Sequence, residues 1–252
     1  MPHLDAIDAR AVHYYVHYTV NDYEDEGLEP HLPPLDERIG NFVARSEKIG
    51  RERVIWRFDP VILSDDLSID DILTRMESIG NRLHSHTEKL VFSFIDIAGY
   101  KKVQKNLGMT SVREPSHGEM EQFAEKIAEM NSRWGLDLAT CGEEVGLERY
   151  GIRHNSCIDA DLLRRLSPGD ARLAEFLGKR NKKDKGQRKA CTCIWSKDIG
   201  QYSTCTNRCL YCYANRSPEE ALENYERHLQ NPISETITGQ NILNDTPSGK
   251  SE

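Results

Sequence analysis

Residues 89–95 read KLVFSFI, an almost continuous apolar run of strand-forming residues. Such a run is typical of a strand that is buried on both faces, as strands of parallel sheets are. A predicted helix precedes this run, and it begins with a capping pair formed by Ser68 and Asp71. Its apolar residues recur at helical spacing: Ile69, Ile72, Leu73, Met76, Ile79 and Leu83. Residues 54–58 form another predicted strand before that helix.

The alternation of strands and helices extends in both directions from this stretch. Residues 13–19 (HYYVHYT) are rich in strand formers, and a helix is predicted to start with Pro34 in its first turn. Ser116 and Glu119 cap another predicted helix, which is followed by a short strand at residues 136–140. Strands separated by helices of this length indicate βαβ units and a parallel sheet. We therefore predict an α/β protein, either a (β/α) barrel or a doubly wound open sheet.

Composition and charge exclude several classes of function. The chain has 252 residues, a net charge of -8 and a pI of about 5.7, which opposes binding to nucleic acid or to anionic membranes. No apolar run approaches the roughly 20 residues that span a bilayer, and no cationic start precedes an apolar secretory stretch. We therefore expect a cytoplasmic protein without membrane contact. Thiols are kept reduced in that compartment, so the seven cysteines indicate metal ligands rather than disulfides.

Three of these cysteines are closely spaced near the C-terminus. Cys205, Cys209 and Cys212 have the spacing C-x3-C-x2-C, with Tyr211 directly before the third. Three thiolates on a short loop suit three corners of a cubane 4Fe–4S cluster, and they leave the fourth iron open to another ligand. The alternatives are a zinc knuckle or a few buried thiols.

The wider sequence resembles an uncharacterised bacterial family that carries a radical-SAM-like cysteine cluster near its C-terminus. The resemblance rests on residues 184–215 (DKGQRKACTCIWSKDIGQYSTCTNRCLYCYAN), with WRFDP at 56–60 and CID at 157–159, and it covers most of residues 14–215. It implies an incomplete or opened (β/α) barrel with a cysteine-rich C-terminal segment, and S-adenosylmethionine bound at the open iron. Radical SAM enzymes, such as spore photoproduct lyase, usually carry this loop after the first strand, whereas here it follows the last predicted strand.

Four cysteines remain outside the loop: Cys141, Cys157, Cys191 and Cys193. Four thiols are enough for a second cluster or a structural zinc site. Cys191-Thr-Cys193 is too tight for the C-x2-C hairpin of a zinc ribbon, but these two residues are the stronger candidates as ligands. Burial as small hydrophobic residues is the alternative for Cys141 and Cys157.

Several polar side chains are predicted to contact the cofactor. Four predicted strands end in polar or sulfur-bearing residues, and active sites of parallel barrels lie at that end of the strands: Thr19, Asp59, Asp96 and Cys141. Arg57 lies two residues before Asp59 and so on the same strand face, where it either binds a carboxylate or phosphate or pairs with Asp59. We therefore predict Arg57, Asp59 and Asp96 as cofactor-binding residues, together with Tyr211 in the cysteine loop. Gly142-Glu143-Glu144 is faintly similar to the radical SAM element that binds the methionine amino group, but three residues carry no prediction.

The predicted organisation has four parts. A partial (β/α) barrel spans residues 1–178, a basic loop and cysteine-rich segment of the same domain spans 179–215, a helix spans 216–231, and a disordered tail spans 232–252. The predicted function is reductive cleavage of S-adenosylmethionine to a 5′-deoxyadenosyl radical that acts on an unknown substrate, with an electron donor as partner. The alternative is a non-catalytic iron–sulfur or zinc-binding protein.

Overall fold

The structure is a computed structural model, and it describes residues 2–179, 183 and 187–239. The chain divides into two compact units. We call residues 1–22, 34–96 and 111–196 the sheet unit, and residues 23–33, 97–110 and 197–252 the loop unit. The predicted tail at 232–252 falls outside the described residues from position 240 onward, as do residues 180–182 and 184–186 of the predicted basic loop.

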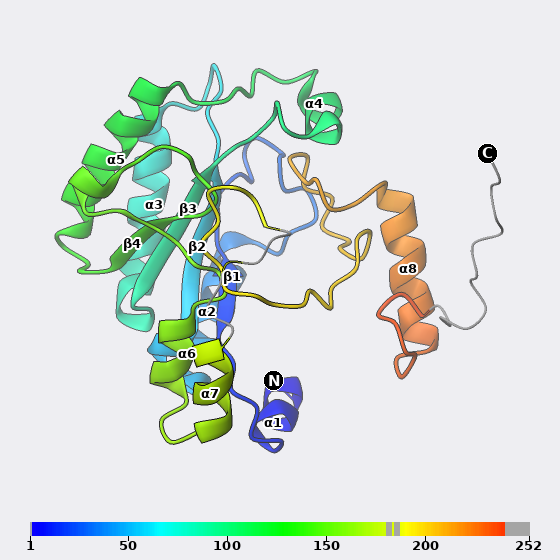
Figure 1. The fold of residues 1–252 in the computed structure, drawn as a ribbon. Coiled ribbons are helices and arrows are strands. Elements are labelled where there is room, and N and C mark those ends of the chain that lie inside the picture. Colours follow the sequence, from blue (N-terminus) through cyan, green and yellow to red (C-terminus); the bar gives the residue numbers. More distant parts are fainter. Residues whose placement is uncertain (1, 180–182, 184–186, 240–252) are drawn as a thin grey trace, which may run out of the picture. The chain divides into compact units, whose positions relative to one another are not determined.

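A five-stranded, all-parallel sheet forms the centre of the sheet unit (Figure 1). Its strands follow one another in sequence order: β1 (Val16–Thr19), β2 (Val54–Val61), β3 (Lys89–Phe94), β4 (Asp137–Thr140) and β5 (Arg153–His154). The predicted α/β class and parallel strands are therefore confirmed. The sheet is not closed into a barrel, because β1 and β5 stand at its two edges instead of pairing with each other.

Three long helices cover one face of this sheet. They are α2 (Leu35–Ile49), α3 (Ile69–Leu83) and α5 (His117–Asn131). The ring of Phe42 on α2 meets Tyr18 on β1, and Phe123 on α5 meets Phe92 on β3. All six apolar residues of the predicted stripe on α3 are buried, as expected of a helix whose apolar face packs on a sheet.

The predicted helix starts are confirmed in detail at α3 and α5. Ser68 and Asp71 form a reciprocal capping box, and so do Ser116 and Glu119. Each pair satisfies backbone N–H groups that have no partner within the helix. Pro34 is the N-cap of α2, one position before the first helical residue.

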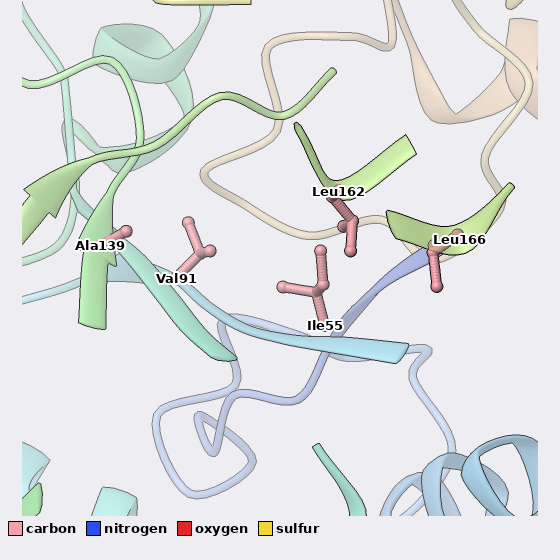
Figure 2. Packing of buried hydrophobic residues seen from close by; sticks show 5 residues of the cluster. All are labelled: Ile55, Val91, Ala139, Leu162 and Leu166. Carbon is pink, nitrogen blue, oxygen red and sulfur yellow. The ribbon is translucent and has the colours of Figure 1, made fainter. Parts of the chain in front are cut away.

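The opposite face of the sheet carries a smaller apolar cluster, shown in Figure 2. Ile55, Val91 and Ala139 project from three neighbouring strands toward Leu162 and Leu166. Both leucines belong to α6 (Ala160–Leu166), which Asp159 caps by accepting bonds from the first turn. This face is thus apolar where α6 covers it, and its remaining part lies toward the carboxyl ends of the strands.

Other elements are short. The sheet unit also contains α1 (Pro2–Asp8), α7 (Ala171–Lys179) and the 3₁₀ turns Arg51–Arg53, His84–His86 and Glu148–Tyr150. The loop unit contains α4 (Lys101–Leu107) and α8 (Pro218–Gln230). None of the helices in the described residues is long and apolar enough to cross a membrane.

Candidate functional site

Polar and sulfur-bearing side chains lie on the sheet face that α6 covers, beyond the apolar cluster and toward the carboxyl ends of the strands. Side chains alternate along a strand, so the residues two positions beyond Ile55, Val91 and Ala139 lie on the same face. These residues are Arg57, Ser93 and Cys141. The carboxyl-terminal half of this face therefore combines a cation, a hydroxyl group and a thiol.

Arg57 is engaged within the protein. Its Nε lies 2.9 Å from Oδ2 of Asp59 and its Nη2 also donates to that oxygen, while Asp59 accepts a further bond from Ser93. The sequence left two roles open for Arg57, binding of a carboxylate or phosphate and pairing with Asp59. The structure shows the ion pair with Asp59. Nη1 of Arg57 donates to Sγ of Cys157 at 3.2 Å. Burial alone would lower the pKa of Arg57. The negative charge of Asp59 and the neighbouring cysteines outweigh this effect, so the pKa of Arg57 is raised.

The four cysteines outside the loop come together beside Arg57. Cys141 follows β4 directly, and its Sγ lies 3.3 Å from Sγ of Cys157. The backbone N–H of Ile158, next to Cys157, donates to Sγ of Cys193 at 3.3 Å, and the backbone N–H of Cys193 donates to Sγ of Cys191 at 3.4 Å. We call Cys141, Cys157, Cys191 and Cys193 the thiol cluster. The hydrogen bond to Cys157 and burial raise the pKa of Cys141, whereas the interaction with Cys157 lowers the pKa of Cys193.

Backbone and hydroxyl contacts hold the segment around Cys157 beside the segment that carries Cys191 and Cys193. The hydroxyl group of Thr192 donates to the carbonyl of Asn155 at 2.9 Å. The backbone N–H of Ile194 donates to the carbonyl of Ile158 at 3.2 Å. Cys193 is 3% exposed, so its thiol is buried against this pair of segments.

Residues of the β1 region fix the backbone of Cys157 from the other side. The hydroxyl group of Tyr15 donates to the carbonyl of Cys157 at 2.7 Å, and Nε2 of His17 lies 3.0 Å from the same oxygen. Burial, reinforced by Arg57, lowers the pKa of His17 to about 4, so the ring is neutral at pH 7. A carbonyl only accepts, so Nε2 carries the ring proton. Tyr15 and His17 were not predicted as site residues, although their spacing of two along a strand is the signal that places them on one face.

The predicted iron–sulfur ligands lie in the loop unit. Cys205, Cys209 and Cys212 are on one loop, which a backbone bond from Ser203 to Ala214 closes at 3.0 Å. A second backbone bond, 3.1 Å long, runs from Cys212 to Cys209 and forms a turn. Cys205 is exposed, whereas Cys209 and Cys212 are partly buried. The loop therefore has one thiol at the solvent and two turned into the protein.

Tyr211 anchors this loop within the same unit. Its hydroxyl group donates to Glu29, a carboxylate residue that is 3% exposed, and Leu210 donates from its backbone to Leu28 at 2.9 Å. Burial raises the pKa of Cys209 to about 12, and the negative charges of Glu29, Cys205 and Cys212 add to this effect.

Two acidic residues complete the sheet unit's candidates. Asp96 is exposed and lies two residues beyond β3. Glu143, which was not predicted as a site residue, accepts a bond from the backbone of Phe94 at 2.8 Å. Burial, with the charges of Cys141 and Asp59, raises the pKa of Glu143 to about 7.

No preformed ion site is present among residues 2–179, 183 and 187–239. In these residues no group of three or more His, Cys, Asp and Glu side chains is arranged to hold a metal ion as it stands. The thiol cluster, whose four residues are all described, is therefore not arranged as an ion site as it stands.

Comparison with known proteins identifies a family and nothing more specific. A family model described as "Domain of unknown function (DUF1848)" matches residues 1–214. No curated protein matches the chain, and no solved structure does.

Proposed function

The chain belongs to the DUF1848 family, and we propose that it is an iron–sulfur protein of the radical SAM type. The observation that supports this proposal is the closed loop on which Cys205, Cys209 and Cys212 lie together. Three soft ligands on one loop, with none of the thiols used in a disulfide, suit a 4Fe–4S cluster with one open iron.

The number of thiols on this loop suits a cluster. A structural zinc ion takes four protein ligands, whereas the loop supplies three cysteines. A cubane accepts three protein thiolates and leaves its fourth iron open. The exposed Cys205 leaves one side of the loop accessible to a cofactor.

The cofactors would supply the difficult chemistry. S-adenosylmethionine would take one electron from the reduced cluster and separate into methionine and a 5′-deoxyadenosyl radical, which would take a hydrogen atom from a substrate. The protein's own part is to hold the loop, and Tyr211 does so through Glu29. An electron donor is required for reduction. Roles for Tyr211, Arg57, Asp59 and Asp96 in binding S-adenosylmethionine stay predictions.

The sheet suits an opened (β/α) barrel, which we propose as the finer description of the fold. Sequential parallel strands with α2, α3 and α5 on one face are the arrangement of consecutive barrel units. The face with Arg57 and Cys141 would then correspond to a barrel interior.

The test is turnover of S-adenosylmethionine by the full chain, reconstituted with iron and sulfide under anaerobic conditions and then reduced. We expect 5′-deoxyadenosine and methionine, measured by mass spectrometry, and no product from Cys209→Ser. A colourless protein that binds zinc at the loop would instead establish the structural alternative. A brown protein whose cluster neither binds nor cleaves S-adenosylmethionine would establish electron transfer.

A further inference from the structure

We propose that the thiol cluster is a second metal centre, in which Cys141, Cys157, Cys191 and Cys193 bind one soft divalent cation such as zinc. It lies wholly within the sheet unit and is independent of the loop that holds Cys205, Cys209 and Cys212. Four thiolates are a complete tetrahedral donor set, so this centre would be structural rather than open to substrate.

The distance between the sulfurs selects a single ion over a cluster. Ligand sulfurs of one tetrahedral zinc are about 3.8 Å apart, given Zn–S bonds of about 2.3 Å. Sγ of Cys141 and Sγ of Cys157 are 3.3 Å apart. The N–H of Ile158, next to Cys157, donates to Sγ of Cys193, and the N–H of Cys193 donates to Sγ of Cys191. A cubane would need the sulfurs several ångströms further apart. A single ion therefore requires a shift of only a few tenths of an ångström for the first pair.

Hydrogen-bond donors already point at these sulfurs. Cys157 accepts from Arg57 at 3.2 Å and from the side-chain amide of Asn155 at 3.3 Å. The backbone N–H of Ile158 donates to Cys193 at 3.3 Å, and that of Cys193 lies 3.4 Å from the sulfur of Cys191. N–H groups around the sulfurs orient thiolate ligands and spread their charge. A dication with four thiolates carries two net negative charges, and the Arg57 guanidinium offsets part of them.

The scaffold around the cluster is built from contacts that do not depend on a metal. Tyr15 and His17 hold the backbone of Cys157, and Thr192 holds the segment of Cys191 and Cys193 to Asn155. The ligands thus come from the end of β4, the segment after β5 and the segment after α7. A bound ion would link the segment that carries Cys191 and Cys193 to the carboxyl-terminal edge of the sheet.

Conversion of the thiol cluster to a metal site requires loss of the thiol protons. Sγ of Cys141 and Sγ of Cys157 are hydrogen-bonded to each other, and the four thiols are not arranged as an ion site as they stand. A metal ion replaces these protons and supplies the attraction that widens the spacing.

The experiment uses the full chain with Cys205, Cys209 and Cys212 all changed to serine, so that the loop holds no metal. After loading with zinc and removal of loosely held metal by dialysis with a weak chelator, we expect about one zinc per chain, as one tetrahedral site requires. Addition of Cys193→Ser to this variant should abolish the bound zinc, and Thr192→Ser is the matched control that should retain it. Absence of zinc from the triple variant would overturn the proposal.

A second measurement keeps the test decisive if Cys193→Ser does not fold. The rate of alkylation of each cysteine in the unsubstituted chain is measured by mass spectrometry with and without zinc. We expect zinc to slow alkylation of all four cluster thiols together. Protection of fewer than four, or a Cys141–Cys157 disulfide that forms in place of metal binding, would overturn the proposal. Loss of the loop's iron would leave this result unchanged, so the two centres are tested separately.

Discussion

Arg57 donates a hydrogen bond from Nη1 to Sγ of Cys157 at 3.2 Å, although 100 residues separate them in the sequence. The same guanidinium is paired with Asp59 on its own strand. Arg57 therefore joins the inner strand β2 to the segment that carries Cys157. Removal of its charge would leave Asp59 as a partly buried carboxylate without its cation.

We predict that Arg57→Met lowers the free energy of unfolding by about 2 kcal/mol, because removal of one member of a partly buried ion pair leaves the other without its counter-charge. Urea unfolding measures this difference. Arg164→Met is the matched control, since the pair of Arg164 with Asp161 is exposed and its loss should cost less than about 1 kcal/mol. Equal losses in the two variants would contradict a structural role for the Arg57–Asp59 pair.

Tyr211 allows its hydroxyl group to be tested apart from its ring. Tyr211→Phe removes the bond to Glu29, and we expect a loss of about 1–3 kcal/mol, because Glu29 is buried and loses a donor. Thermal unfolding of the full chain measures it. Tyr202→Phe should change stability by less than about 0.5 kcal/mol, because Tyr202 is 67% exposed. A Tyr211→Phe protein as stable as this control would show that Tyr211 does not anchor the loop.

The three loop cysteines should act as one site. Each of Cys205→Ser, Cys209→Ser and Cys212→Ser should remove most of the same cluster, because a cubane held by three thiolates depends on all of them. Iron and sulfide per chain after anaerobic reconstitution are the measurement. Thr206→Ala, in the same loop, should retain the cluster. A full complement of iron in all three serine variants would place the cluster elsewhere.

The contribution of Glu119 to the free energy of unfolding should depend on pH. Arg113 first, and then the bonds from Ser116, lower the pKa of Glu119 from 4.5 to about 2. A carboxyl group with a lowered pKa stabilises the fold above its unfolded pKa, and this contribution is lost as the pH falls through the folded value. The stability difference between the unsubstituted chain and Glu119→Gln should therefore be full at neutral pH and shrink between pH 4.5 and about 2. A difference that does not vary with pH would contradict this pKa.

The periodic part of the fold was predictable from the sequence. The run at 89–95 and the stripe on α3 are local patterns, and so are the capping pairs at Ser68 and Ser116. Local patterns left a closed barrel and an open sheet as alternatives, because closure depends on which distant strands pair. β5 contains only two residues and has no detectable alternation.

The candidate sites were predictable to different degrees. Spacing alone identified Cys205, Cys209 and Cys212, because they lie within one loop. Cys141 and Cys157 meet because β4 and β5 are neighbours and each cysteine follows one of these strands. The sequence suggested this association only because four cysteines remained outside the loop. Glu143 was missed because its raised pKa arises from burial, which the sequence does not display.

The central claim is that the loop holds a cluster with an iron open to S-adenosylmethionine. Its most direct test is the low-temperature EPR spectrum of the reduced, reconstituted protein with and without S-adenosylmethionine. Binding at the open iron changes the ligand field there, so we expect the spectrum to shift with saturable dependence on S-adenosylmethionine concentration. A spectrum that stays the same at saturating S-adenosylmethionine would contradict the claim.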